Sequence, residues 1–348
     1  MIRNFLFLVF ATCAAYLIYV YPLSAASYLI TGQFFDVTVA AGASIGVACV
    51  VLLYLRTHSS SPVLSGFTHY GMGIGCIAVT VMSIGLLIAL LVPHLAYHIG
   101  LVCVTLTAGL TVVALVNGRR LIVKPLAISS DKISASKELI FISDIHLGSN
   151  PKEHVARLVT EINALSHDAV LIGGDLFDSS AFQPTDLEPL LSLQKPIFFV
   201  TGNHEFYVRN HEHKLAALAD YNVQTIDNKT VMFEGIHLIG IGDNQTVAAQ
   251  SAFAREAVKD DSFNLVLVHQ PGIWGRLPKQ ADFMISGHTH NGQIFPFNLL
   301  VRLQFTAVYG LYEQSDNRLY VSSGSGCWGP RMRLGTQNEI IHLTLASG

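Results

Sequence analysis

The chain has 348 residues, of which 51% are hydrophobic and only 13% charged, and its formal net charge is −3. This near-neutral balance, without a basic stripe, argues against a nucleic-acid-binding protein. Residues 1–118 contain only Arg3, Asp36 and Arg56 as charged side chains, whereas the rest of the chain has an ordinary charge density. The composition therefore predicts a transmembrane region over 1–118, a linker over 119–137 and a water-exposed domain over 138–348.

Four apolar segments, at about 5–21, 37–55, 72–92 and 95–116, are the predicted membrane spans. Each approaches the roughly 20 residues that a helix needs to cross the hydrocarbon layer. Glycines recur in these segments, which is typical of helices that pack closely in lipid. The sequence therefore predicts a multi-pass membrane protein with about four helices.

Basic residues indicate the orientation of these spans. With a cytoplasmic N-terminus, the basic residues of the loops all fall on the cytoplasmic side, and the predicted outer loops 22–36 and 93–94 have neither Lys nor Arg. This asymmetry follows the positive-inside rule. It predicts an inner (cytoplasmic) membrane protein whose catalytic domain faces the cytoplasm. An alternative takes residues 1–26 as a cleaved signal peptide, and it leaves the domain on the same side.

The water-exposed domain alternates apolar runs with amphipathic segments. Strands are predicted at 138–142, 169–172, 197–200, 265–268, 282–285, 319–321 and 340–345, with a hairpin at 231–241. Helices are predicted at 154–165, 187–193, 215–221 and 248–258. Strands that alternate with helices and then dominate indicate a layered α/β domain with a mixed sheet or two packed sheets.

Polar side chains with metal-binding chemistry come at or just after the ends of five of these apolar runs. They are Asp144, His146, Asp175, Asn203, His269, His288 and His290. Turns that follow the strands of one sheet bring their side chains to one rim. Seven oxygen and nitrogen ligands are too many for one ion and suit two, and a carboxylate can bridge ions about 3.5–4 Å apart. Ligands of this kind favour Mn, with Fe or Zn as alternatives, and the lack of thiolates argues against a structural zinc site.

His204 and Glu205 are the predicted catalytic residues. His204 follows the expected ligand Asn203 and is the natural general acid for the leaving oxygen. A neighbouring carboxylate raises the pKa of an imidazole and fixes its tautomer, so Glu205 is expected to tune His204.

Together these motifs resemble the calcineurin-like metallophosphoesterase superfamily over about 139–345. The resemblance implies a four-layer αββα sandwich that binds two ions at its rim. When the family's ligand positions are transferred to the matching motifs of this sequence, the resemblance implies two sites. One ion would be held by Asp144, His146, Asp175 and His290, and the other by Asp175, Asn203, His269 and His288. The pattern at 287–296 is similar to a membrane-associated bacterial branch that includes YkuE- and YaeI-like phosphodiesterases, although Asn291 stands where that branch more often has Gly.

Three features have two interpretations each. Asp178 is either a partner behind the ligands or a helix cap. His211 and His213, with Arg209 and Lys214, either line a phosphate entrance or form a solvated helix start. The apolar segment 294–305 is either core or a membrane-facing, acyl-binding wall.

The sequence thus predicts a metal-dependent phosphoric ester hydrolase that uses metal-activated water. Its predicted substrate is a phosphoester or pyrophosphate in a lipid or lipid-linked nucleotide, because a membrane-tethered domain meets lipids in its own plane. One alternative is a phosphodiesterase or phosphatase that acts on soluble substrates, such as a cyclic nucleotide or a phosphoprotein. Another is a non-catalytic metal-binding membrane sensor or transporter.

Overall fold

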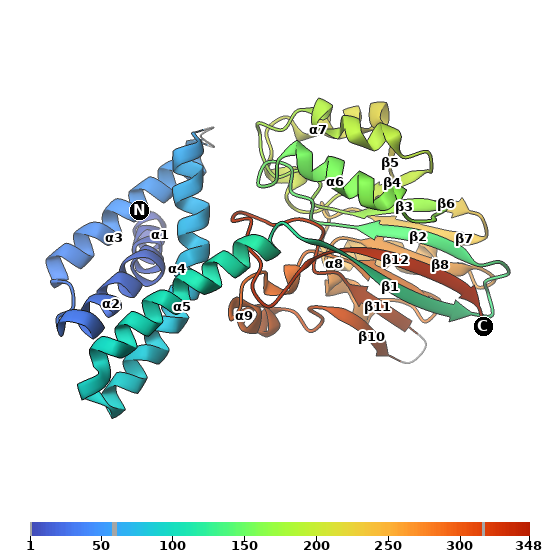
Figure 1. Ribbon diagram of the computed structural model, residues 1–348. Helices are drawn as coiled ribbons and strands as arrows, with labels where there is room; N and C mark the ends of the chain where they lie inside the picture. Colours follow the sequence, from blue (N-terminus) through green and yellow to red (C-terminus); the bar gives the residue numbers. More distant parts are fainter. Residues whose placement is uncertain (1, 58–60, 315–316) are drawn as a thin grey trace. The chain divides into compact units, whose positions relative to one another are not determined.

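The computed structural model describes residues 2–57, 61–314 and 317–348 (Figure 1). It divides the chain into two compact units. The helical unit contains the residues up to Asn117 together with Ile294–Phe297 and Met332–Leu334, and the α/β unit contains the remainder.

Among its described residues, the helical unit has four helical stretches long and apolar enough to span a membrane: Leu6–Thr31, Val37–Arg56, Val63–Leu91 and Pro93–Asn117. Its elements are α1 (Ile2–Ala15), the π-helix η1 (Tyr16–Val20), α2 (Tyr21–Thr31), α3 (Val37–Thr57), α4 (Pro62–Leu91), η2 (Pro93–Leu95) and α5 (Ala96–Asn117). These spans confirm the predicted membrane protein.

Two predicted span boundaries are wrong. The first stretch continues through α2 where a loop over 22–36 is predicted, and the third begins near residue 62 instead of 72. Pro22 lies in the first turn of α2, directly after the π-helix η1, so the irregular part of the helix falls where proline cannot donate a helical hydrogen bond. Ala25 and Leu29 are buried in the same apolar cluster as Ile77 of α4, so tertiary packing favours helix there.

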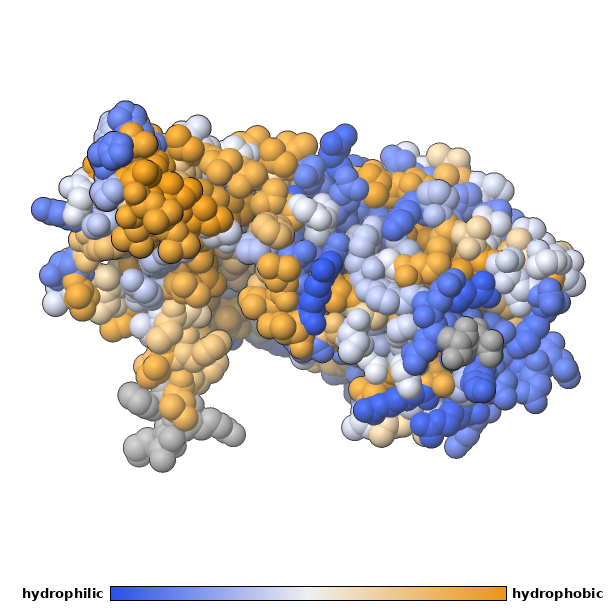
Figure 2. All heavy atoms as spheres, turned by 90° about the horizontal axis from the view of Figure 1, so that it is seen from below, coloured by the Kyte–Doolittle hydropathy of each residue, from blue (hydrophilic) through white to orange (hydrophobic). Residues whose placement is uncertain are grey.

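Glycine allows the helices of this unit to approach one another closely. A Cβ atom on Gly75 would lie 2.2 Å from the Ile18 carbonyl oxygen, and one on Gly100 would lie 2.9 Å from Leu29 Cβ. Small residues that let a neighbouring helix approach this closely favour helix association in lipid, where burial of apolar surface does not. Hydrophobic side chains cover much of the outer surface of the helical unit (Figure 2), as expected for a lipid-facing surface.

The α/β unit contains two six-stranded mixed sheets. The first has the order β1-β12-β2-β3-β4-β5 and the second β10-β11-β9-β8-β7-β6. The first sheet is built from β1 (Leu121–Ser130), β2 (Lys137–Ile142), β3 (Ala169–Gly173), β4 (Ile197–Val200), β5 (Val223–Thr225) and β12 (Asn338–Ser347). The second is built from β6 (Lys229–Phe233), β7 (Ile236–Ile241), β8 (Phe263–Val268), β9 (Phe283–Ser286), β10 (Gly310–Gln314) and β11 (Asn317–Val321).

Helical segments complete four layers. The α-helices are α6 (Lys152–Asn163), α7 (His211–Ala216), α8 (Val247–Ala257) and α9 (Phe297–Gln304), and the 3-10 helices are η3 (Pro184–Ser192), η4 (Glu205–Tyr207), η5 (Ala217–Tyr221), η6 (Pro271–Arg276) and η7 (His290–Gly292). One core packs α6 and η3 on the first sheet, a second fills the space between the sheets, and a third packs α8 and η6 on the second sheet.

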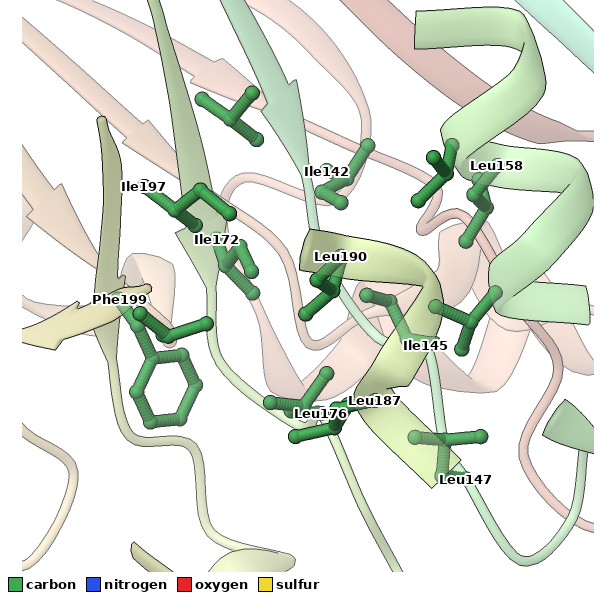
Figure 3. Packing of buried hydrophobic residues seen from close by; sticks show 14 of the residues in the cluster. Ile142, Ile145, Leu147, Leu158, Ile172, Leu176, Leu187, Leu190, Ile197 and Phe199 are labelled. Atoms are coloured by element: carbon green, nitrogen blue, oxygen red, sulfur yellow. The ribbon is translucent and has the colours of Figure 1, made fainter. Parts of the chain in front are cut away.

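Figure 3 shows the first of these cores, where Leu158 of α6 and Leu187 and Leu190 of η3 lie over Ile142 and Ile172. Strands that are buried on both faces explain why their sequences are continuously apolar and do not alternate. The predicted α/β fold with four layers is confirmed.

Two elements differ from the sequence-based interpretation. Strand β1 lies in the segment 119–137, which has little apolar periodicity, and its pairing with β12 along the edge of the sheet makes it a strand. In the apolar segment 294–305, Ile294 is buried, but no residue of α9 is. The core interpretation is therefore wrong for α9.

Candidate metal centre

Each predicted ligand stands just after a strand, as its sequence position predicts. Asp144 and His146 follow β2, Asp175 follows β3 and Asn203 follows β4; His269 follows β8, and His288 and His290 follow β9. The neighbouring strands β2, β3 and β4 run parallel, and so do β8 and β9. Parallel strands deliver the residues after their carboxyl ends to one edge of the sheet.

Five of these residues adopt a left-handed backbone conformation that non-glycine residues rarely adopt. Their φ angles are 54° for Asp144, 51° for His146, 53° for Asp175, 73° for His288 and 50° for His290. Each such residue costs about 1–3 kcal/mol, and this kind of strain clusters at functional sites. Here it turns each side chain out of the line of its strand.

Gly174 makes room for this turn. Its φ is +87°, and a Cβ atom there would lie 2.6 Å from His269 Nδ1 and 2.8 Å from the Gly202 amide. The residue before Asp175 must therefore be glycine, both for its conformation and for its space.

Asp144, His146 and His290 form one converging group. The Asp144 Oδ1 atom lies 3.3 Å from His290 Nε2, and the Nε2 atoms of His146 and His290 are 3.1 Å apart. One ligand atom from each residue lies within 4.8 Å of the others. Asp144 and His146 are fully buried, and His290 is 11% exposed at its side chain.

Asp175, His269 and His288 form a second converging group. Asp175 Oδ2 lies 3.1 Å from His269 Nε2, which in turn lies 3.1 Å from His288 Nδ1. The same Asp175 oxygen lies 3.7 Å from His146 Nε2 in the first group. Asp175 therefore stands between the two groups, where a bridging carboxylate would stand.

Hydrogen bonds behind the ligands orient their rings. His269 Nδ1 lies 2.8 Å from the Gly173 carbonyl oxygen, so it donates there and directs Nε2 at Asp175, where a bound metal ion would displace the ring proton. His146 Nδ1 lies 3.3 Å from Asp178 Oδ2, a close ion-pair contact on the same side of its ring. Asp144 accepts from the His288 amide and from Ser143 Oγ at 2.6 Å.

The buried charges shift one another's pKa values. Burial alone would raise the pKa of Asp175, but His269 outweighs it and holds that pKa well below the usual range. Burial lowers the pKa of His269, yet the Asp175 carboxylate outweighs it and raises that pKa well above its usual value. For His288, burial and the neighbouring His269 lower the pKa to about 3, so its imidazole is neutral and able to ligate at neutral pH.

Asn203 adds a neutral oxygen. Its Oδ1 atom is buried and has no hydrogen-bond partner among the residues that the structure describes. A buried carbonyl oxygen without a partner is costly, and a bound cation would satisfy it. The donor set of carboxylate, amide and imidazole groups fits divalent ions such as Mn, Fe or Zn.

His204 and Glu205 do not relate to each other as their sequence positions predict. The Glu205 carboxylate is fully buried and accepts from four backbone amides, those of Asp175, Leu176, Phe177 and Gly202, at 2.6–3.1 Å. Two other carboxylates lie near His204: Asp175 Oδ2 is 4.0 Å from His204 Nε2, and an Asp178 oxygen lies within 4.8 Å of a His204 ring nitrogen.

The expected influence of Glu205 on His204 is therefore wrong. Burial and the neighbouring His146 lower the pKa of His204 to about 4, and Glu205 does not raise it. Glu205 instead holds the backbone of the Asp175 turn against the backbone at Gly202. That contact cannot be read from a motif in which the two residues are adjacent.

Two further residues complete the surroundings of the centre. Asp178 lies behind His146 and also accepts a hydrogen bond from Ser149 Oγ at 2.6 Å. Of its two sequence-based interpretations, this position favours a partner behind the ligands. Trp328, which is 46% exposed, has its ring 5.8 Å from that of His204. In the sequence, only its position three residues after Asp175 points to Asp178. Nothing in the sequence indicates that the Trp328 ring lies next to that of His204.

Comparison with known proteins agrees with this geometry. Residues 138–292 match the family model for calcineurin-like phosphoesterases. An uncharacterized metallophosphoesterase of Helicobacter pylori is 37% identical over 235 residues, which cover 64% of this chain and 63% of that protein. A bovine (Bos taurus) transmembrane protein with a metallophosphoesterase domain is 32% identical over 276 residues, 70% of this chain and 61% of the relative. The uncharacterized metallophosphoesterase YkoQ of Bacillus subtilis is 27% identical over 236 residues, 60% and 84% of the two chains.

The chain spans less than two thirds of the length of the first two of these relatives. The shared region includes the strands that carry the candidate ligands, and the relatives' names indicate a metal-dependent phosphoester hydrolase. The chain therefore contains a calcineurin-like phosphoesterase domain over residues 138–292, and it is similar to proteins named metallophosphoesterases.

Proposed function

We propose that this protein is a membrane-anchored phosphoesterase with two divalent ions, and that it hydrolyses a phosphoester or pyrophosphate bond in a lipid or lipid-linked nucleotide. The observation that carries the hydrolase assignment is the position of Asp175, whose Oδ2 lies 3.1 Å from His269 and 3.7 Å from His146. One carboxylate within reach of both imidazole groups is the arrangement that a two-metal site needs.

Each residue has a defined role in this proposal. One ion would be held by Asp144, His146, Asp175 and His290, and the other by Asp175, Asn203, His269 and His288. Manganese suits this oxygen-plus-imidazole set. When bound, the ions supply Lewis acidity to the phosphoryl oxygens and lower the pKa of a water molecule.

His204 would hold the proton for the leaving oxygen. Its side chain is 18% exposed and lies at the mouth of the cluster, whereas the rings of His146 and His269 are fully buried. Burial and His146 lower its pKa, and the negative charge of a bound phosphoester opposes both effects. Glu205 would act only by positioning the backbone on either side of Asp175.

Helix α9 supports a lipid substrate. Leu299, Leu300 and Leu303 are 52%, 58% and 84% exposed. Phe305, just beyond the helix, has its ring 5.3 Å from that of the candidate ligand His288. Exposed apolar helix faces of this kind suit a membrane interface or an acyl chain.

The connection to the membrane spans favours the same substrate class. Helix α5 ends at Asn117 and β1 begins at Leu121, so the tether is about 10 Å long when extended. A tether of this length would raise the effective concentration of membrane lipids for the catalytic unit. Because Arg119, Arg120 and Lys124 follow the last span, we place this unit on the cytoplasmic face of the inner membrane.

A turnover screen tests the proposal. The full-length protein in nanodiscs, loaded with Mn²⁺, is offered bis(p-nitrophenyl) phosphate, cyclic AMP, a nucleoside-diphosphate-linked diacylglycerol and a headgroup analogue without acyl chains. We expect metal-dependent turnover with a gain of at least tenfold in kcat/KM from the acyl chains. No turnover of any phosphoester would refute the hydrolase; turnover without a gain from acyl chains would refute the lipid substrate and favour a soluble one.

The variant Leu299→Gln/Leu303→Gln sharpens the test of α9. We expect it to remove most of the acyl-chain gain while leaving kcat/KM for bis(p-nitrophenyl) phosphate within about twofold, since each leucine contact with an acyl chain contributes about 1–3 kcal/mol. The double variant Leu191→Gln/Val247→Gln, at exposed apolar positions outside α9, is the matched control.

A further inference from the structure

A hollow of about 780 Å³ lies where α7 meets the loop after β3. Its walls include Ser180 and Gln183 from that loop, and Arg209, His211, His213 and Lys214 from the segment that enters and forms α7 (α7 is marked in Figure 1). This volume is within the range of about 300–1,000 Å³ that is typical of small-molecule sites.

The hollow is rich in nitrogen donors. Two permanent cations and two imidazoles line it, against a single carboxylate from Glu212. Within the described parts of the chain, no carboxylate lies within the 4.0 Å of an ion pair from either Arg209 or Lys214. The electrostatic balance therefore favours an anion, and the guanidinium of Arg209 suits the oxygens of a phosphate.

Lys214 is held in place as a fixed positive charge. It is only 8% exposed, its Nζ donates to the Ser180 carbonyl oxygen at 2.9 Å, and it lies 5.5 Å from the centre of the Phe182 ring. The ammonium group has three donors, and the Ser180 carbonyl uses one of them. Asp186 is the nearby carboxylate, and its Oδ2 accepts from the Gln183 amide.

Two short chain segments connect the walls of the hollow with residues of the candidate metal centre. Ser180 is two residues, about 7 Å at most, from Asp178, which lies behind His146. Tyr207, whose ring is 5.3 Å from that of His204, is two residues before Arg209. The Arg209 amide donates to Ser180 Oγ at 3.1 Å and thereby joins the two segments.

We propose that this hollow is a second anion subsite, which binds a further phosphate group of the same substrate while the metal centre acts on the scissile phosphorus. The substrate class is then a phosphoester or pyrophosphate with a second phosphate about one sugar ring away, as in a nucleotide. This inference rests on the proposed function for the reaction, but the binding that it describes requires no turnover.

A matched pair of chromogenic nucleotides tests the subsite in the full-length, Mn²⁺-loaded protein. Thymidine 5′-(p-nitrophenyl phosphate) and its 3′-phosphorylated counterpart differ only in the distal phosphate. We expect the 3′-phosphorylated compound to have a kcat/KM about tenfold higher, which corresponds to one charge-assisted contact. In Arg209→Gln/His213→Gln this ratio should fall towards one, whereas Lys195→Gln, which removes an exposed surface charge, should keep it.

Calorimetric binding of thymidine 3′,5′-bisphosphate and thymidine 5′-monophosphate separates this inference from the hydrolase. A preference for the bisphosphate that disappears in Arg209→Gln/His213→Gln supports the subsite even if no nucleotide is hydrolysed. Equal binding of the two nucleotides by the unmodified protein would overturn it. Inorganic phosphate is the third ligand: if it binds as tightly as the bisphosphate and loses that binding in the double variant, the hollow is an independent anion site and the substrate assignment is wrong.

Discussion

The two sheets of the α/β unit contribute different chemistry to the candidate metal centre. The first sheet, through the turns after β2, β3 and β4, contributes both carboxylates and the amide, together with His146 and His204. The second, through the turns after β8 and β9, contributes only imidazoles, those of His269, His288 and His290. The two groups described above each take members from both sheets, and a third cluster, of His146, Asp178 and His204, comes from the first sheet alone. The packing of the two sheets is therefore part of the two-ion site, while the first sheet by itself also gathers ligand-type side chains.

The sharpest way to break this arrangement is to remove the residue between the two groups. Asp175→Ala should lose both ions and reduce kcat/KM by about 10³-fold or more. The substitution removes the carboxylate that both ions would share, and it also removes the negative charge that pairs with the His269 imidazole. Metal content by mass spectrometry and turnover of bis(p-nitrophenyl) phosphate measure the effect. Asp260→Ala, an exposed loop carboxylate, is the control. Retention of two ions by Asp175→Ala would contradict the shared ligand.

His204 tests whether the first sheet contributes a proton donor in addition to ligands. His204→Ala should lower kcat by roughly 10²–10⁴-fold and keep both ions, because general acid catalysis contributes about that much and His204 is not one of the seven expected ligands, even though its ring nitrogen lies near His146 and Asp178. The loss should be smaller for a substrate with a p-nitrophenolate leaving group, which needs no proton. Wild-type turnover of an alkyl phosphoester would rule out the general acid.

Asp178 tests the orientation of the first group. Asp178→Asn removes the carboxylate 3.3 Å from His146 Nδ1, and we expect about 10–100-fold weaker binding of one ion. Titration with Mn²⁺, followed by electron paramagnetic resonance, should then show one weakened and one unchanged site. Equal weakening of both sites would mean that Asp178 stabilises the whole rim.

Glu205 has the smallest expected effect on chemistry. Glu205→Gln replaces a buried acceptor of four amide hydrogen bonds with one that has a single acceptor oxygen, so about 1–3 kcal/mol of stability should be lost. A lower Tm of the detergent-solubilised protein, with kcat reduced less than tenfold, is the expected result. Glu188→Gln, at an exposed position, should leave Tm unchanged. A pH–rate profile that shifts with Glu205→Gln would instead indicate a role in proton transfer.

Much of the fold is predictable because its strands are short, continuous apolar runs. The hairpin of β6 and β7 around Glu234 and Gly235 is an example, since the turn residues stand between two apolar segments. The extension of the first span through α2 is not predictable, because Pro22, Ser24 and Ser27 resemble a loop until their burial in the helical unit is known. Strand β1 is hidden for a related reason: only its pairing with β12 makes it a strand.

The phosphoesterase motifs, the number of membrane spans and the residue types of the candidate centre were predictable from the chain, because ordered motifs and apolar runs are local properties. Which side chains contact one another depends on the tertiary structure. It placed Asp175 between two imidazole groups, turned Glu205 away from His204, and assembled Arg209, His211, His213 and Lys214 around one hollow. These relations depend on the packing of two sheets and on backbone turns at single residues, and both arise from contacts between segments far apart in the chain.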